Sequence, residues 1–223
     1  MDPKDVTIDV LAKGMKLTGG QLTHLALNLD NGFHPTRKQR VGNRDREIDA
    51  PKKHVKARLR RLHRLLMRLT PAHRCAHGGA RGKSCVTSAR QHCGRRFIVT
   101  RDVKDCYPSI LVDALKSRLR RLGFRSDVAW VLSLLLTVRG RVAQGSPVSS
   151  DALNLYLFDA DRALSALAGT IGVASQGRMT TSLFPWTMRD IENHRATRCA
   201  SRLMGMASRS TRKNCAAIRQ SRS

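Results

Sequence analysis

The stretch from Arg96 to Ile110, which reads RFIVTRDVKDCYPSI, constrains the fold more than any other part of the chain. Its apolar run Phe97-Ile98-Val99 is rich in β-forming residues and predicts a short buried strand. Asp102 and Asp105 follow where the strand gives way to a turn. A carboxylate at such a strand end, flanked by backbone carbonyls, suits a hard divalent cation. The spacing is equally compatible with aspartates that cap the next helix.

The rest of the chain is dominated by helical patterns. Pro108 fits a first helical turn, and leucines follow it at helical spacing to Leu122. Lys52 to Leu69 predicts a basic amphipathic helix whose arginines, Arg61 among them, face outward. The remaining predicted helices are Leu22–Gly32, Ser126–Thr137 with Ser126 as N-cap, and Val148–Leu167 closed by Gly169.

The charge balance points to a polyanionic partner. Lysine and arginine number 42 against 16 aspartates and glutamates, a formal net charge of +26 over 223 residues. Such a surplus favours nucleic acid, through phosphate contacts and counterion release. We expect no membrane segment, because no long apolar run is present. The six cysteines lack paired spacing and are typical of free thiols in a reducing cytoplasm.

A second motif stands downstream of the first: Gln144-Gly-Ser-Pro-Val-Ser-Ser, followed by Asn154 and Leu155. Together with Asp102-Val-Lys-Asp-Cys-Tyr-Pro-Ser-Ile, it resembles the catalytic boxes of reverse transcriptases of the retron and group II intron type. The resemblance covers roughly residues 44–175. Two boxes in the right order, with helices between them, are far more specific than either box alone.

The resemblance implies roles for the residues of the first box. Asp102 would bind divalent metal, Mg²⁺ in this family, helped by the backbone carbonyl of Val103. Asp105 would cap the turn near the incoming triphosphate. Tyr107 stands at the position whose ring packs under the nucleotide sugar and discriminates against a 2′-hydroxyl group.

The family pattern also implies nucleotide-binding residues outside the first box. Gln144 and Gly145 would hold nucleotide and template near the metal. The segment Arg44–Pro51 predicts a short exposed strand and is similar to the family's Arg-x-Ile-x-x-Pro segment. Arg46 matches its arginine, and a bidentate guanidinium suits a phosphate better than lysine does. The alternative reading of Arg46 is an ordinary surface arginine.

Six histidines and cysteines crowd the segment His73–Cys93 without a Cys-x-x-Cys half. A zinc site is therefore the weaker hypothesis for this segment. The Gly78–Ser84 loop fails as a phosphate loop, because His77 stands where that motif needs glycine. The segment is better matched by the family's connection between fingers and palm.

The family's third element, a hairpin bearing Tyr-x-Asp-Asp, is missing. In-line phosphoryl displacement uses two metals about 3.5–4 Å apart, so the first aspartate needs carboxylate partners on the adjacent hairpin. No acidic residue stands between Asp161 and Asp190. If the gene is read one base earlier, the last base of the Met179 codon and the first two bases of the Thr180 codon form GAC, which encodes aspartate. If the Arg178 codon ends in G, the codon just before this one also encodes aspartate. We therefore hypothesise a reading-frame change at or just before Gly177.

The resemblance implies an α+β fold, the fingers and partial palm of a right-hand polymerase. We expect an N-terminal segment and fingers-like region (1–96), a partial palm with a small antiparallel sheet (97–175) and a disordered basic tail (176–223). The family reaction is addition of a dNTP to the 3′-hydroxyl of a DNA or RNA primer on an RNA template. We expect little activity without the third element. The alternative is a non-catalytic protein that binds RNA or DNA.

Overall fold

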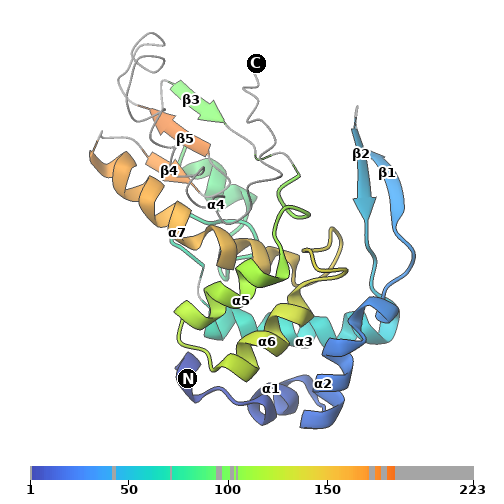
Figure 1. Ribbon diagram of the computed structural model, residues 1–223. Coiled ribbons are helices and arrows are strands. Elements are labelled where there is room, and N and C mark those ends of the chain that lie inside the picture. The colour runs from blue at the N-terminus through green and yellow to red at the C-terminus, as the bar shows by residue number, and fades with distance from the viewer. Residues whose placement is uncertain are drawn as a thin grey trace. The chain divides into compact units, whose positions relative to one another are not determined.

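The computed structural model of the protein describes residues 2–41, 44–70, 72–93, 97–100, 103, 105–170, 174–176 and 180–183. Helices predominate, and two small antiparallel sheets accompany them, one of two strands and one of three (Figure 1). This combination confirms the α+β class. The division into fingers and palm remains a prediction.

The chain folds into two compact units, each assembled from separate stretches of sequence. Unit 1 comprises Met1–Pro71 and Asp105–Tyr156, and unit 2 comprises Ala72–Lys104 and Leu157–Ser223. The regions predicted from sequence were consecutive, whereas each unit here is discontinuous. The long helix α7 (Ser149–Thr170) begins in unit 1 and ends in unit 2.

Unit 1 is built mainly from helices around a leucine-rich core. Its helices are α1 (Ile8–Met15), α2 (Gly19–Leu27), α3 (Lys53–Leu69), α5 (Val112–Arg121), α6 (Ser126–Leu136) and the short 3₁₀ turns η1 (Pro3–Asp5) and η2 (Leu29–Gly32). The fully buried leucines come from every one of the five α-helices: Leu11, Leu22, Leu59, Leu62, Leu66, Leu115, Leu119, Leu132, Leu135 and Leu136. Burial of this apolar surface is the main term that stabilises the unit.

Helix α3 has the predicted apolar stripe, but one of its arginines does not face solvent as expected. Arg61 donates a hydrogen bond of 3.2 Å to the backbone carbonyl of Met15. Arg58 donates to the carbonyls of Met15 and Lys16 at 3.0 and 2.7 Å. Both guanidinium groups thus neutralise the carbonyl-rich C-terminus of α1, a favourable place for a cation.

A two-stranded hairpin projects from the helices of unit 1 (Figure 1). Strand β1 (Arg37–Val41) pairs antiparallel with β2 (Arg44–Ile48), with Gln39 opposite Arg46. The predicted strand at Arg44–Ile48 is confirmed. Backbone bonds continue the pairing at the base of the hairpin, where the N–H of His34 donates to the carbonyl of Ala50 at 2.9 Å.

Unit 2 contains the three-stranded sheet, in the order β3-β5-β4, and the short helix α4 (Cys85–Arg90). Strand β3 (Phe97–Thr100) confirms the strand predicted at the start of the first box. Strands β4 (Ala174–Gln176) and β5 (Thr180–Leu183) pair antiparallel, and β5 also pairs with β3. We expected no regular structure from residue 176 onward, and β5 contradicts this, because Thr180 and Thr181 are β-branched residues suited to a strand.

Several helix ends differ from their predictions. Ser126 is the first residue of α6, and Arg125 occupies the cap position without a side-chain cap bond. Helix α7 runs past Gly169 to Thr170. The predicted helix at residues 22–32 divides into α2 and the 3₁₀ turn η2. Among the described residues, every helix is too short or too polar to span a bilayer.

Candidate nucleotide site

Four of the predicted nucleotide-binding residues line one cavity in unit 1. The cavity has a volume of about 300 Å³. Its wall contains Arg46 from β2, Tyr107 from the turn within the first box, and Gln144 and Gly145 from the loop before α7. Ile48, Ser146, Ser149 and Ser150 complete the lining. Residues nearly one hundred positions apart in sequence therefore meet in one place.

A tight turn shapes the loop that carries Gln144. Val138 and Arg141 pair through a β-bridge, and the two residues between them both have positive φ, 51° at Arg139 and 76° at Gly140. Two residues with positive φ between paired ends correspond to the type I′ turn. The N–H of Val142 then donates to the carbonyl of Ile110 at 3.0 Å. This bond joins the loop to the end of the first box.

The loop touches the base of the β1–β2 hairpin through backbone atoms. The N–H of Asp49 donates to the carbonyl of Gln144 at 2.7 Å. At Gly145, where φ is +111°, a Cβ atom would lie 3.0 Å from the carbonyl oxygen of Asp49. Glycine is therefore required at position 145 both for its conformation and for the close approach of the two backbones.

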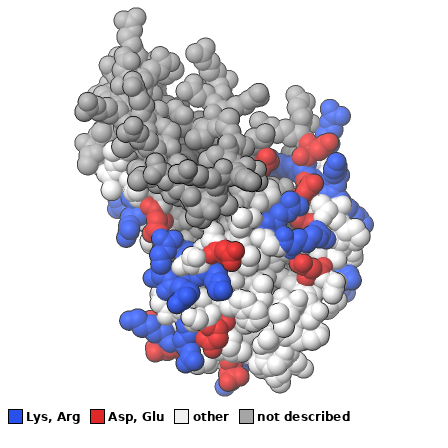
Figure 2. Space-filling model, in the orientation of Figure 1, with Lys and Arg blue, Asp and Glu red and all other residues white. Residues whose placement is uncertain are grey.

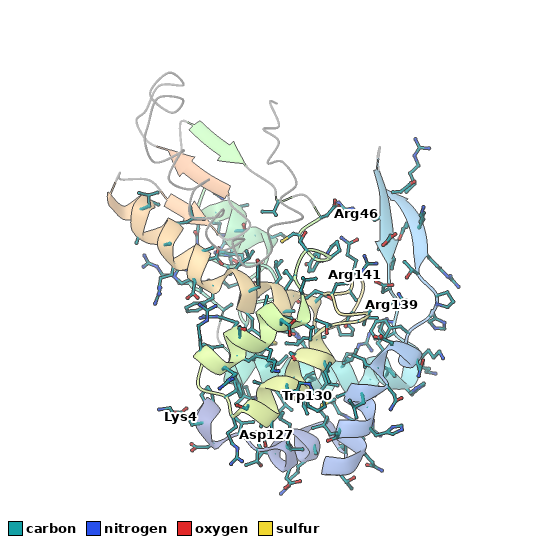
Figure 3. All side chains as sticks on the ribbon, viewed as in Figure 1. Lys4, Arg46, Asp127, Trp130, Arg139 and Arg141 are labelled. Carbon is teal, nitrogen blue, oxygen red and sulfur yellow. The ribbon has the colours of Figure 1, made fainter. Side chains whose placement is uncertain are left out.

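A buried polar network fastens the hairpin to the same loop. The Asp49 side chain is 5% exposed, and its Oδ1 accepts bonds from Thr36 Oγ1 at 2.6 Å and Arg139 Nη1 at 2.9 Å. Farther out, Arg141 pairs with Glu47 at 2.9 Å. In Figure 3 the labelled Arg46, Arg139 and Arg141 lie between the hairpin and the loop. Sequence reasoning missed Thr36, Asp49 and Arg139; the Arg139-Gly140 pair, a turn signal, was the available clue.

The turn that presents Tyr107 is held by local bonds. Asp105 has a positive φ of 49°, and its carbonyl accepts bonds from the N–H and the hydroxyl of Ser109 at 3.1 and 2.7 Å. The Asp105 side chain is exposed, and Asp105 is not among the lining residues. Asp105 therefore belongs to the turn that carries Tyr107. Its position beside a bound triphosphate stays a prediction.

The predicted metal ligands fall largely outside the described residues. Asp102 lies outside them, and Val103 is described without regular structure. Among the described residues, no group of three or more His, Cys, Asp or Glu side chains is arranged to hold a metal ion. The donor set for a two-metal centre is therefore not assembled in the described part of the chain, and Mg²⁺ binding stays a prediction.

Next to the cavity, the first turn of α7 carries a buried carboxyl group. Asp151 Oδ2 lies 2.7 Å from Nδ1 of His63, which comes from α3. Burial raises the pKa of Asp151 to about 6, although the hydrogen bond with His63 opposes the shift. The pair ties the start of α7, beside the cavity, to helix α3.

Unit 2 holds a separate polar cluster within the His73–Cys93 segment and α7. The Nδ1 atom of His73 lies 3.0 Å from the buried Cys75 thiol, and the His73 ring packs edge-on against Phe158. Burial raises the pKa of Asp161 to about 6, against a hydrogen bond with Cys75. Burial, together with nearby Arg74, Lys83 and Arg162, lowers the pKa of His73. This arrangement gives the zinc hypothesis no support among the described residues.

Comparison with known proteins identifies relatives of one kind. The chain is 31% identical to the retron Mx162 reverse transcriptase of Myxococcus xanthus, over 80% of this chain and 41% of the relative. It is 33% identical to the retron Mx65 reverse transcriptase of the same organism, over 57% of this chain and 34% of the relative. The retron Se72 reverse transcriptase of Salmonella heidelberg matches at 24% identity over 73% of this chain. No family model matches, and the chain spans less than half the length of these curated relatives.

Proposed function

We propose, from the premise that this chain is related to the retron-type reverse transcriptases, that unit 1 carries the nucleotide-binding part of an RNA-directed DNA polymerase. One observation carries the proposal. Arg46, Tyr107, Gln144 and Gly145, chosen from the family's motifs, line one cavity. The family reaction would add a dNTP to a primer 3′-hydroxyl on an RNA template.

The chemistry of the lining residues fits a nucleoside triphosphate. The Arg46 guanidinium is exposed at the cavity and offers paired donors to phosphate oxygens. Ser149 and Ser150 begin the 22-residue helix α7, whose N-terminus favours an anion. Tyr107 supplies a ring for the sugar. A phosphate end and a sugar end are thus present in one cavity.

Chemistry at this cavity would need a metal centre that the chain supplies only in part. Mg²⁺ would be held by Asp102 with the Val103 carbonyl, and it would stabilise charge on the transferred phosphoryl group. The strands β4 and β5 carry Ala, Ser, Gln, Thr and Leu and no carboxylate. We therefore propose that the chain binds the substrates of the reaction and performs it negligibly.

The test is triphosphate binding to the purified chain. We expect dGTP with Mg²⁺ to bind, and Arg46→Gln to weaken the affinity about tenfold, the effect of losing one charge-assisted contact of about 1.4 kcal/mol. Arg125→Gln is the matched control, because Arg125 is an exposed arginine of unit 1 paired with Asp127 away from the cavity. Equal affinities for all three proteins would contradict the proposal.

A non-catalytic nucleic-acid-binding protein is the second candidate, favoured by the +26 charge and the missing acidic motif. On the face in Figure 2, basic side chains are spread over the described surface and interleaved with acidic ones. Such a distribution suits contacts with phosphates along a strand. Steep loss of RNA affinity with salt, in a chain that does not bind dGTP, would favour this candidate over the first.

A further inference from the structure

Asp49 contacts Thr36, Arg139 and Gln144, and so joins the base of the β1–β2 hairpin to the loop before α7. Its carboxylate is buried, and a buried carboxylate is costly unless its oxygens are bonded. Thr36 Oγ1 and Arg139 Nη1 supply those bonds at 2.6 and 2.9 Å. The same Nη1 also donates to Thr36 Oγ1 at 2.7 Å, which closes a triangle of three side chains. We call Thr36, Asp49 and Arg139 the clamp.

The backbone of Asp49 faces the loop that lines the cavity. Its N–H donates to the Gln144 carbonyl, and its own carbonyl lies against Gly145. Arg46 stands three residues before Asp49 on β2. Asp49 therefore links the strand of Arg46 to the loop of Gln144 through its backbone atoms.

Arg139 adopts a conformation that its residue type rarely takes. Its φ of 51° lies in the left-handed region, which is uncommon for residues other than Gly, Asn and Asp. The backbone N–H of Arg139 donates to the Asp30 carboxylate at 2.8 Å, while its guanidinium reaches the clamp. Strain of this kind persists where the surroundings fix it, and it concentrates at functional sites.

None of the three clamp residues lines the cavity. Their side chains contact the segments that line the cavity and would not contact a ligand bound in it. Binding of a triphosphate by Arg46 and Gln144 together requires a fixed separation between hairpin and loop, and displacements of about 1 Å are enough to lose such contacts. The clamp joins the base of the hairpin to the loop through buried polar contacts.

We propose that Thr36, Asp49 and Arg139 are positioning residues for the triphosphate: they hold the β1–β2 hairpin against the 138–145 loop, so that Arg46 and Gln144 bind one ligand together. The identity of the ligand rests on the proposed function. The exposed pair Arg141–Glu47 adds little, since surface ion pairs are screened by water.

The test compares near-isosteric variants of the full chain. Thr36→Val removes the hydroxyl group of the clamp at constant shape, and Thr36→Ser restores it. Asp49→Asn removes the charge. Two readouts are taken, amide hydrogen exchange in residues 37–48 and affinity for dGTP with Mg²⁺, with deoxyguanosine as the ligand that lacks phosphates. Arg125→Gln serves as control.

We expect Thr36→Val and Asp49→Asn to speed exchange in the hairpin and to weaken dGTP binding about tenfold, with deoxyguanosine unaffected and Thr36→Ser close to the unaltered chain. Unchanged exchange in the hairpin would overturn the proposal. So would faster exchange with unchanged dGTP affinity, because the clamp would then be structural only. Failure of the unaltered chain to bind dGTP would count against the proposed function, and the exchange data would still decide whether the clamp holds the hairpin.

Discussion

The two units differ in which of the residues predicted from motifs their described parts bring together. In unit 1, residues taken from three motifs meet around one cavity, and a buried network holds the walls together. In unit 2, the strands β4 and β5 form a hairpin beside β3, yet they carry no acidic residue. Strand formation needs only β-branched and small residues in a compatible register, whereas catalysis needs particular carboxylates. Paired strands can thus form here without the carboxylates that catalysis needs.

The largest expected effect tests the hairpin of unit 2. We expect this chain to extend a primer on an RNA template no faster than the background rate, whichever divalent metal is supplied. The product of the gene read one base earlier from Arg178 should be at least about 10³-fold faster, because paired carboxylates are worth several kcal/mol of metal stabilisation. Primer extension assays with both proteins measure the ratio.

Two results would contradict this prediction. Robust extension by the present chain that vanishes in Asp102→Ala would show that another acid completes the metal site. A shifted reading frame that meets a stop within a few codons would remove the frame-change hypothesis itself.

A smaller effect tests the close approach in unit 1. Gly145→Ala should lower the free energy of unfolding by about 3 kcal/mol, since φ is +111° and the new Cβ would lie 3.0 Å from a carbonyl oxygen. Gly20→Ala in α2 is the control, because no atom lies within 4 Å of its Cβ position. It should be neutral or stabilising by up to about 1 kcal/mol. Urea unfolding curves give both values, and equal losses would refute the packing argument.

The smallest effect compares two buried carboxyl groups of α7, one in its first turn and one near its middle. The pKa of Asp151 in unit 1 and that of Asp161 in unit 2 are both about 6 in the folded chain, above the roughly 3.9 of an unfolded aspartate. The folded state therefore binds the proton more tightly, and stability present below about pH 4 is lost as pH rises through 6.

Relative to Asp151→Asn, the unaltered chain should thus lose about 2 kcal/mol of unfolding free energy between pH 4 and pH 7. Asp161→Asn should show a similar difference. Denaturant titrations at four pH values provide the comparison. If the difference in unfolding free energy between the unaltered chain and one variant does not change with pH, the carboxyl group replaced in that variant is exposed to water.

The sequence was sufficient where local pattern decides the structure. The leucines of α3 repeat at helical spacing, and all of them except Leu65 are buried. The apolar run at Phe97–Thr100 forms β3. Motif spacing alone points to Arg46, Tyr107 and Gln144, and the three residues line one cavity. Their role in binding a nucleotide stays a prediction.

The sequence was insufficient where distant residues meet. Thr36, Asp49 and Arg139 span more than one hundred positions, and nothing in their local pattern marks them as partners. Arg61 resembles its exposed neighbours on α3, and only the position of the end of α1 turns it into a cap. The segment Thr180–Leu183 carries no acidic motif, so the family pattern does not predict a strand there. A strand needs no carboxylate, and these residues form β5.

The order of the two units along the chain has a consequence for synthesis. Unit 1 is complete at Tyr156, before Gly177, where the family pattern ends. Compact units fold as the ribosome releases them, at about 5–20 residues per second. A ribosome that reaches codon 177 has therefore already made every residue that unit 1 needs, whichever frame it then reads. Changes beyond that codon therefore leave the amino-acid sequence of unit 1 unaltered.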